Sequence, residues 1–284
     1  MRTLLTSFRF RPLLSPLSVA LLASALPQLS QAQTAHDGNA QPWQMGMTAG
    51  ASDVSAQVVF FHNYVLLPVI GFICVFVLLL LAIVIFRFSE KKNPVPSKVS
   101  HNTVLEVVWT AIPLLILGIM FIPSIRILYF AESTGQSDIT VKVVGHQWYW
   151  SYVYTDVKSY NVGDDTVKYD SIMMTKEALP ADEKDLYRLR ADKPLYLPLN
   201  KKVKLILTSQ DVIHSFSVLP LGLKMDAIPG RNNETWVRAT KPGIYYGFCT
   251  ELCGINHAFM PIEIRVVSDD EFQNWLNSNG GKEA

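Results

Sequence analysis

Metal-ligating side chains gather near the C-terminus, in the segment GFCTELCGINHAFM. Cys249, Cys253, His257 and Met260 fall within twelve residues, and His214 lies about 35 residues upstream of Cys249, in DVIHSF. Thiolate and thioether sulfurs select soft copper, and imidazoles suit copper as well. The spacing therefore predicts a copper centre.

One cysteine, two histidines and a weakly bound methionine are typical of single-copper electron-transfer sites, and this segment adds a second cysteine. Two thiolates can bridge two copper ions, each completed by one imidazole. Met260 and a backbone carbonyl such as that of Glu251 then remain as weak axial ligands. Sharing one electron hole between bridged metals spreads the change in charge, so little reorganisation accompanies each transfer. Our interpretation is a dinuclear centre that relays single electrons.

Two plainer interpretations of the same residues stay open. Cys249 and Cys253 can form a disulfide if the domain is exported, or the two cysteines and two histidines can bind zinc. A disulfide leaves the convergence of the histidines and Met260 unexplained, and zinc has no use for a methionine at that spacing. Copper accounts for the whole set.

The N-terminal residues have the pattern of an export signal, which would carry the metal domain across the membrane. A basic start is followed by an apolar stretch, Leu17–Leu26, and by small residues up to Ala32 that resemble a signal-peptidase site. The alternative is a membrane anchor, but Pro16 and Pro27 bound a stretch shorter than the ~20 residues that a span needs. We expect a cleaved export signal.

Two later segments are long enough to cross a membrane. Tyr64–Phe86 and Val107–Ile125 contain no charged residue, and each can span about 30 Å as a helix. The loop between them carries four basic residues against the single acid Glu90. This excess places the loop in the cytoplasm and the metal domain outside.

From about Ser137 onward, short β-rich runs alternate with turn residues, which is typical of an antiparallel sandwich or barrel. This part holds 17 basic and 20 acidic residues counted from Glu132, so we expect no nucleic-acid partner. The predicted organisation is an export signal at 1–32, an exported segment at 33–62, membrane helices at 63–88 and 105–130 around a loop at 89–104, a β-domain at 137–270, and a C-terminal helix and tail at 271–284.

Several separate motifs resemble those of subunit II of the haem–copper oxidases, of the proteobacterial type. They are LEVVWTAIPLLIL, PSIRILY, GHQWYWSY, DVIHSFSVLPLGLKMDAIPGRNNETW and the metal-binding segment itself. The resemblance implies a two-helix transmembrane hairpin followed by an all-β cupredoxin-like sandwich with a dinuclear copper A centre. It implies these ligands: His214, Cys249, Glu251 through its carbonyl, Cys253, His257 and Met260.

The resemblance also implies a role in respiration. Quinol-using relatives lack the copper ligands, so cytochrome c is the expected donor, and haem in subunit I, beside copper B, is the expected acceptor. The expected function is electron entry for oxygen reduction coupled to proton translocation. Subunit I and other oxidase subunits are the expected partners in a bacterial inner membrane, with the copper domain in the periplasm. The Glu251 side chain is expected to share a magnesium ion with subunit I.

The resemblance implies functional roles for four further residues, and each of them also has a simpler structural explanation. Trp148 resembles a surface electron-entry residue, although an aromatic at strand spacing is commonly core. Asp192 and Asp211 match positions that dock basic cytochrome c, although an isolated aspartate is commonly just solvated. A third docking acid is replaced here by Val153. Glu106 resembles a proton-uptake entrance, although a carboxylate at a helix end can simply reach water.

Two rival functions remain. A membrane-tethered copper or zinc carrier would share the metal ligands but would need neither the Trp148 motif nor Glu106. A structural subunit of a quinol oxidase would hold its two cysteines as a disulfide. Copper content and redox behaviour separate these alternatives.

Overall fold

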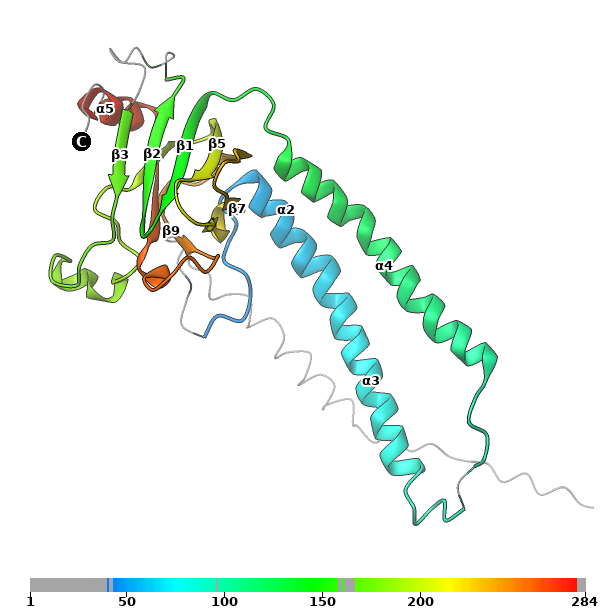
Figure 1. Cartoon of the computed structure of the whole chain (residues 1–284). Coiled ribbons are helices and arrows are strands. Elements are labelled where there is room, and N and C mark those ends of the chain that lie inside the picture. Colours follow the sequence, from blue (N-terminus) through cyan, green and yellow to red (C-terminus); the bar gives the residue numbers. More distant parts are fainter. Residues whose placement is uncertain (1–39, 41–42, 96, 158–159, 161–166, 280–284) are drawn as a thin grey trace, which may run out of the picture. The chain divides into compact units, whose positions relative to one another are not determined.

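The computed structural model describes residues 40, 43–95, 97–157, 160 and 167–279. The export signal predicted at 1–32 lies outside these residues. The described chain contains two long apolar helices, then a β-sandwich, then a C-terminal helix (Figure 1). This order confirms the expected fold class.

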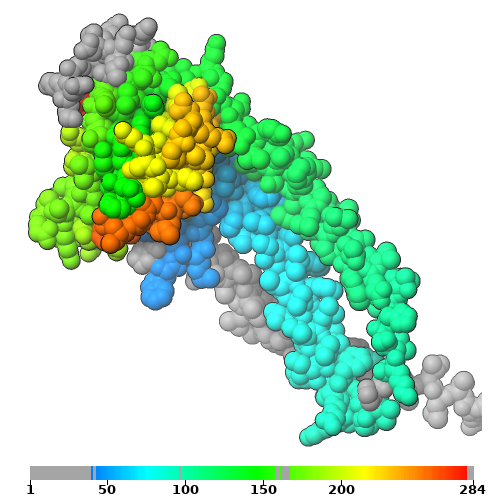
Figure 2. Space-filling view, in the orientation of Figure 1, coloured from blue at the N-terminus to red at the C-terminus, as the bar shows by residue number. Residues whose placement is uncertain are grey.

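The first long helix consists of three consecutive segments, α2 (Asp53–Phe61), the π-helical η2 (His62–Leu66) and α3 (Leu67–Arg87). The second is α4 (Thr103–Glu132). Their mean hydropathy reaches 3.5 and 2.3, and both are long enough to cross a membrane. Neither α3 nor α4 buries a residue, and the space-filling view shows uncovered side chains along both helices (Figure 2). Such surfaces require lipid or other protein around them.

The first helix begins earlier than the charge-free run from Tyr64 indicates. Ser52 is its N-cap, because its side chain accepts a hydrogen bond from the Ser55 backbone N–H, and the Ser55 side chain in turn accepts from the Ser52 N–H. The acidic Asp53 in the first turn suits the positive end of the helix dipole. A polar first turn therefore precedes the apolar part.

The β-domain is built from two five-stranded sheets, β3-β2-β1-β5-β8 and β4-β10-β9-β6-β7. Within the first sheet, β1 pairs antiparallel with β2 and parallel with β5. In the second, β9 pairs antiparallel with both β10 and β6. The strands are β1 (Ile139–His146), β2 (Tyr149–Thr155), β3 (Val167–Ser171), β4 (Leu195–Pro198), β5 (Lys202–Ser209), β6 (His214–Val218), β7 (Leu223–Ala227), β8 (Asn233–Arg238), β9 (Gly243–Cys249) and β10 (Pro261–Val267).

Short helical segments complete the domain: the 3-10 turns η4 (Ala181–Leu186), η5 (Leu219–Leu221) and η6 (His257–Phe259), and the α-helix α5 (Asp269–Asn279). The core lies between the sheets, where side chains alternate in and out along β1. Trp150, Tyr152 and Tyr154 of β2 are fully buried. Trp148 does not share their strand face, since it lies in the turn between β1 and β2.

Candidate metal centre

The predicted ligands meet where three strands of one sheet begin or end. Cys249 is the last residue of β9, and Phe216 of β6 pairs with it, so His214 at the start of β6 lies nearby. The loop after Cys249 returns through η6 to Met260, immediately before β10. Antiparallel pairing therefore brings together residues about 35 positions apart in sequence.

The donor atoms fall into two similar halves. Around the Cys249 Sγ lie the His214 Nδ1 at 3.9 Å and the Glu251 carbonyl oxygen at 3.2 Å. Around the Cys253 Sγ lie the His257 Nδ1 and the Met260 Sδ, each at 3.5 Å. The two sulfurs are 3.9 Å apart. Each half thus offers one thiol, one imidazole and one weak ligand.

These distances suit metal binding. Two ligands at about 2.0–2.3 Å from one tetrahedral ion lie roughly 3.5 Å from each other. An ion between the two sulfurs can touch both, because twice a bond of about 2.3 Å exceeds their separation. A disulfide would need about 2.05 Å, whereas these cysteines are free thiols. Among the described residues, His214, Cys249 and Cys253 each place one ligand atom within 4.8 Å of the other two, and all three are buried.

The site also shifts the protonation of its ligands. Burial raises the pKa of Cys249, but hydrogen bonds with His214 and with backbone groups outweigh burial and hold this pKa below its ordinary value. Burial raises the pKa of Cys253, and the neighbouring Cys249 raises it further. The metal-free pair thus favours one thiolate over two. A bound cation would stabilise both thiolates by replacing their protons.

Buried aromatic side chains pack against the candidate ligands His214 and Met260. The Trp150 ring meets the His214 ring edge-on with centroids 5.8 Å apart, and its indole N–H donates to the Met260 carbonyl at 3.4 Å. Phe216 packs against the same indole at 5.2 Å. Sequence reasoning missed this role of Trp150. Its position two residues after Trp148 was the available signal that it lies near the same centre.

Trp148 contacts the metal-binding loop directly. Its indole N–H donates to the Cys253 carbonyl at 3.3 Å, and the Gln147 side-chain amide donates to the same oxygen at 2.7 Å. Gly254 makes this approach possible, because a Cβ there would come within 3.0 Å of the Trp148 ring, and its φ of +127° favours glycine. Trp148 is half-buried. Sequence reasoning missed Gln147, although it adjoins Trp148.

The two acids expected to dock a partner differ in their surroundings. Asp211 bonds to His214, with its Oδ1 2.9 Å from the His214 Nε2. Asp192 is exposed and accepts hydrogen bonds from the backbone N–H groups of Ile172 and Lys193. Among the described residues, Asp211 is thus next to the candidate ligands and Asp192 is bonded to backbone elsewhere.

Glu106 lies in the first turn of α4, away from the ligands in sequence and on a separate element. Its carboxylate accepts a hydrogen bond from the Asn102 backbone N–H at 3.3 Å, while the Asn102 side chain caps the helix. The described contacts therefore give Glu106 a helix-capping role.

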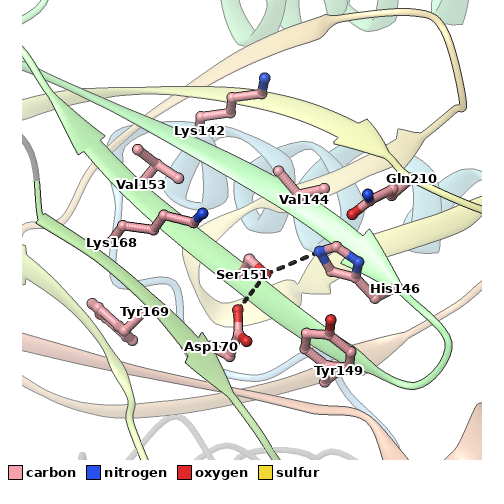
Figure 3. Close-up of a pocket in the computed structure, with 10 residues that line it drawn as sticks. All are labelled: Lys142, Val144, His146, Tyr149, Ser151, Val153, Lys168, Tyr169, Asp170 and Gln210. Atoms are coloured by element: carbon pink, nitrogen blue, oxygen red, sulfur yellow. Dashed lines mark hydrogen bonds between the residues drawn. The ribbon is translucent and has the colours of Figure 1, made fainter. Parts of the chain in front are cut away.

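A separate depression of about 530 Å³ lies over β1, β2 and β3 (Figure 3). In it the Ser151 hydroxyl donates to Asp170 at 2.6 Å and lies 2.9 Å from the His146 Nε2. A hydrolytic triad needs histidine between serine and carboxylate, whereas here serine is in the middle. The geometry gives His146 a structural hydrogen bond and does not arrange Ser151 as a nucleophile.

Comparison with known proteins identifies the family. The family model described as "Cytochrome C oxidase subunit II, periplasmic domain" matches residues 139–267, and the corresponding transmembrane-domain model matches residues 40–127. A probable cytochrome c oxidase subunit 2 of Rickettsia felis is 48% identical over 237 residues, which are 84% of this chain and 72% of the relative. The subunit 2 of Cereibacter sphaeroides is 37% identical over 272 residues, 93% of this chain and 89% of that protein.

Among solved structures, the periplasmic domain of cytochrome oxidase subunit II from Bradyrhizobium japonicum is 43% identical, with a TM-score of 0.44, and covers 51% of this chain and 96% of that one. The relatives in sequence span both the apolar helices and the β-domain. The chain therefore belongs to the cytochrome c oxidase subunit II family and is a membrane-bound subunit of a haem–copper oxidase.

Proposed function

We propose that this chain is the electron-entry subunit of its oxidase: it accepts electrons from cytochrome c at a dinuclear copper centre and delivers them to haem in subunit I. One observation carries the proposal. Two free cysteine sulfurs lie 3.9 Å apart, each with its own imidazole nitrogen and its own weak ligand. The depression of about 530 Å³ over β1, β2 and β3 offers no comparable set of metal donors, because no cysteine or methionine lines it.

The ligand set fits copper better than its alternatives. Soft sulfur donors and imidazoles together suit copper, and a methionine ligand has no place in a structural zinc site. Cys249, Cys253, His214 and His257 would hold the copper ions. Met260 and the Glu251 carbonyl would bind weakly. A copper pair bound there supplies one-electron storage with little change in structure.

The protein residues around the ligands would control access. Trp148 is half-buried and hydrogen-bonded to the Cys253 carbonyl, so it offers a short route from the surface to a metal-binding residue. Cytochrome c is basic, and carboxylates at the surface of the β-domain would steer its approach. Asp192 and Asp211 are the proposed contributors, with Val153 at a position where relatives are expected to carry an acid.

The remaining roles depend on partner subunits. The exposed Glu251 side chain would share a magnesium ion with subunit I, because carboxylate oxygens are preferred magnesium ligands. Glu106 would admit protons toward subunit I. The basic loop between the two helices would face the cytoplasm, and the metal domain would face the periplasm of a bacterial inner membrane, after removal of the export signal at 1–32.

Anaerobic stopped-flow mixing of reduced cytochrome c with the purified oxidase tests this function. We expect rapid cytochrome c oxidation that slows as ionic strength rises, followed by haem reduction. Glu106→Gln should leave this first phase intact, whereas a separate aerobic measurement should show slower steady oxygen consumption. Oxygen consumption driven by quinol, with cytochrome c inert and copper near zero in this subunit, would contradict the proposal and favour a structural role. Bound zinc would favour a carrier.

A further inference from the structure

The topology brings Gln147 and Asp211 together although 64 residues separate them. Strands β1 and β5 run parallel, and their register ends with Gly145 opposite Ser209. Two residues beyond that pair, the segment after β1 reaches Gln147 and the segment after β5 reaches Asp211. The turn that carries Trp148 and the segment that leads to His214 therefore continue side by side from the same end of β1 and β5.

Both oxygens of the Asp211 carboxylate are occupied by groups of this site. Its Oδ1 accepts from the His214 Nε2–H at 2.9 Å and from the Val212 N–H at 2.6 Å, and its Oδ2 accepts from the Gln147 N–H at 2.7 Å. Because a carboxylate only accepts, the His214 hydrogen must be on Nε2, which leaves Nδ1 free toward Cys249. Asp211 thus determines which nitrogen can bind metal.

A second link continues from Gln147 to the other half of the centre. The Gln147 side chain donates to the Cys253 carbonyl, and the Trp148 indole donates to the same oxygen. His214 is completely buried, whereas the Asp211 side chain is 31% exposed. Asp211 therefore connects the buried His214 to the surface turn through its hydrogen bond with Gln147.

We propose that Asp211 is a positioning residue of the metal centre, which orients His214 and holds the Gln147–Trp148 turn against Cys253. The consequence of this inference for electron entry rests on the proposed function. A carboxylate behind a ligating histidine fixes the ring and increases its basicity. Loss of Asp211 should therefore change the centre itself, even when no cytochrome c is present.

The test compares Asp211→Asn with Asp192→Asn in the full-length protein. Both variants remove one negative charge, but Asp192 accepts only from the backbone N–H groups of Ile172 and Lys193 among its described hydrogen bonds. Asparagine at 211 keeps one acceptor oxygen, so it cannot serve both the His214 ring and the Gln147 N–H. Steering by surface charge would affect the two variants alike.

Two readouts apply. In copper-loaded protein, competition with a copper chelator should show roughly 10–100-fold weaker binding for Asp211→Asn, with altered hyperfine splitting in the electron paramagnetic resonance spectrum. In metal-free protein, hydrogen exchange at the Gln147 amide should accelerate roughly tenfold, the effect of losing one hydrogen bond to a charged group. Asp192→Asn should leave both readouts unchanged.

Unchanged copper affinity, spectrum and Gln147 exchange in Asp211→Asn would overturn the inference, whatever happens to cytochrome c turnover. Equal, salt-dependent slowing of cytochrome c oxidation in both variants, with these three readouts intact, would assign Asp211 to docking alone and overturn it too. The exchange measurement needs no metal. A protein that binds no copper would thus refute the proposed function, while faster Gln147 exchange would still support the positioning role.

Discussion

Two clusters of the β-domain combine histidine, carboxylate and a hydroxyl or thiol, yet they have different chemistry. At the metal centre, His214 is held by Asp211 and directs its second nitrogen toward Cys249. On the outer face of the other sheet, His146 meets the Ser151 hydroxyl and stacks on Tyr149, with centroids 4.4 Å apart (Figure 3). The first histidine lies beside sulfur donors, whereas the residues lining the depression around the second include no cysteine or methionine.

Similar residue types alone therefore do not make a metal-binding site. Burial lowers the pKa of His146, and its described hydrogen bond is with the Ser151 hydroxyl, which itself donates to Asp170. In the metal centre, burial also opposes protonation of His214, but its contacts with Cys249 and Asp211 outweigh burial and raise its pKa. Convergence of sulfur donors on free imidazole nitrogens distinguishes the functional cluster.

The largest expected effect comes from Cys253→Ser. This change removes one of the two sulfurs proposed to hold the copper pair, so the remaining ligands should hold at most one copper ion. Metal analysis should show loss of the two-copper stoichiometry together with loss of the shared-electron spectrum. Cys74→Ser is the matched control, because Cys74 lies in α3 and is exposed. An unchanged spectrum in Cys253→Ser would refute the assignment.

The next effect is on electron entry. Trp148→Phe removes the indole N–H that bonds to the Cys253 carbonyl, and loss of about 1 kcal/mol with this hydrogen bond corresponds to a roughly fivefold lower rate. Stopped-flow mixing should show slower oxidation of cytochrome c at full copper content. Trp275→Phe, in α5, should leave the rate unchanged. Equal slowing in both variants would indicate a general packing defect.

A smaller effect is expected from Gly254→Ala. The positive φ strains an alanine by about 1–3 kcal/mol, and the new Cβ would press on the Trp148 ring at 3.0 Å. Gly230→Ala provides the control, since its φ is +74° and no heavy atom lies within 4 Å of its Cβ. Thermal unfolding should show destabilisation in both. Slower electron entry should appear only in Gly254→Ala, and its appearance in Gly230→Ala would contradict this view of the loop.

The smallest effect concerns the outer cluster. Ser151→Ala breaks the hydrogen bonds to His146 and Asp170 and should lower the free energy of unfolding by about 1 kcal/mol. Copper content, affinity and cytochrome c oxidation should stay at their original values, as measured beside a denaturant titration. Loss of copper in this variant would mean that the two clusters are coupled and that our contrast between them is wrong.

Most of the candidate donor residues could be picked out from the sequence because they cluster in one loop, with His214 farther upstream, and the apolar helices were predicted because they lack charge. It placed Trp148 on the strand face of Trp150 by period two, whereas the chain turns there. The link between Gln147 and Asp211 was not predictable, because it depends on the parallel register of β1 and β5. That pairing leaves no local signal in either segment.

The most direct test of the account is copper stoichiometry combined with electron paramagnetic resonance on the purified, copper-loaded protein. We predict two copper ions per chain that share one unpaired electron, since the two sulfurs and two imidazoles form matching halves of one centre. A single localised copper ion, bound zinc, or a metal-free disulfide between Cys249 and Cys253 would contradict the electron-entry function.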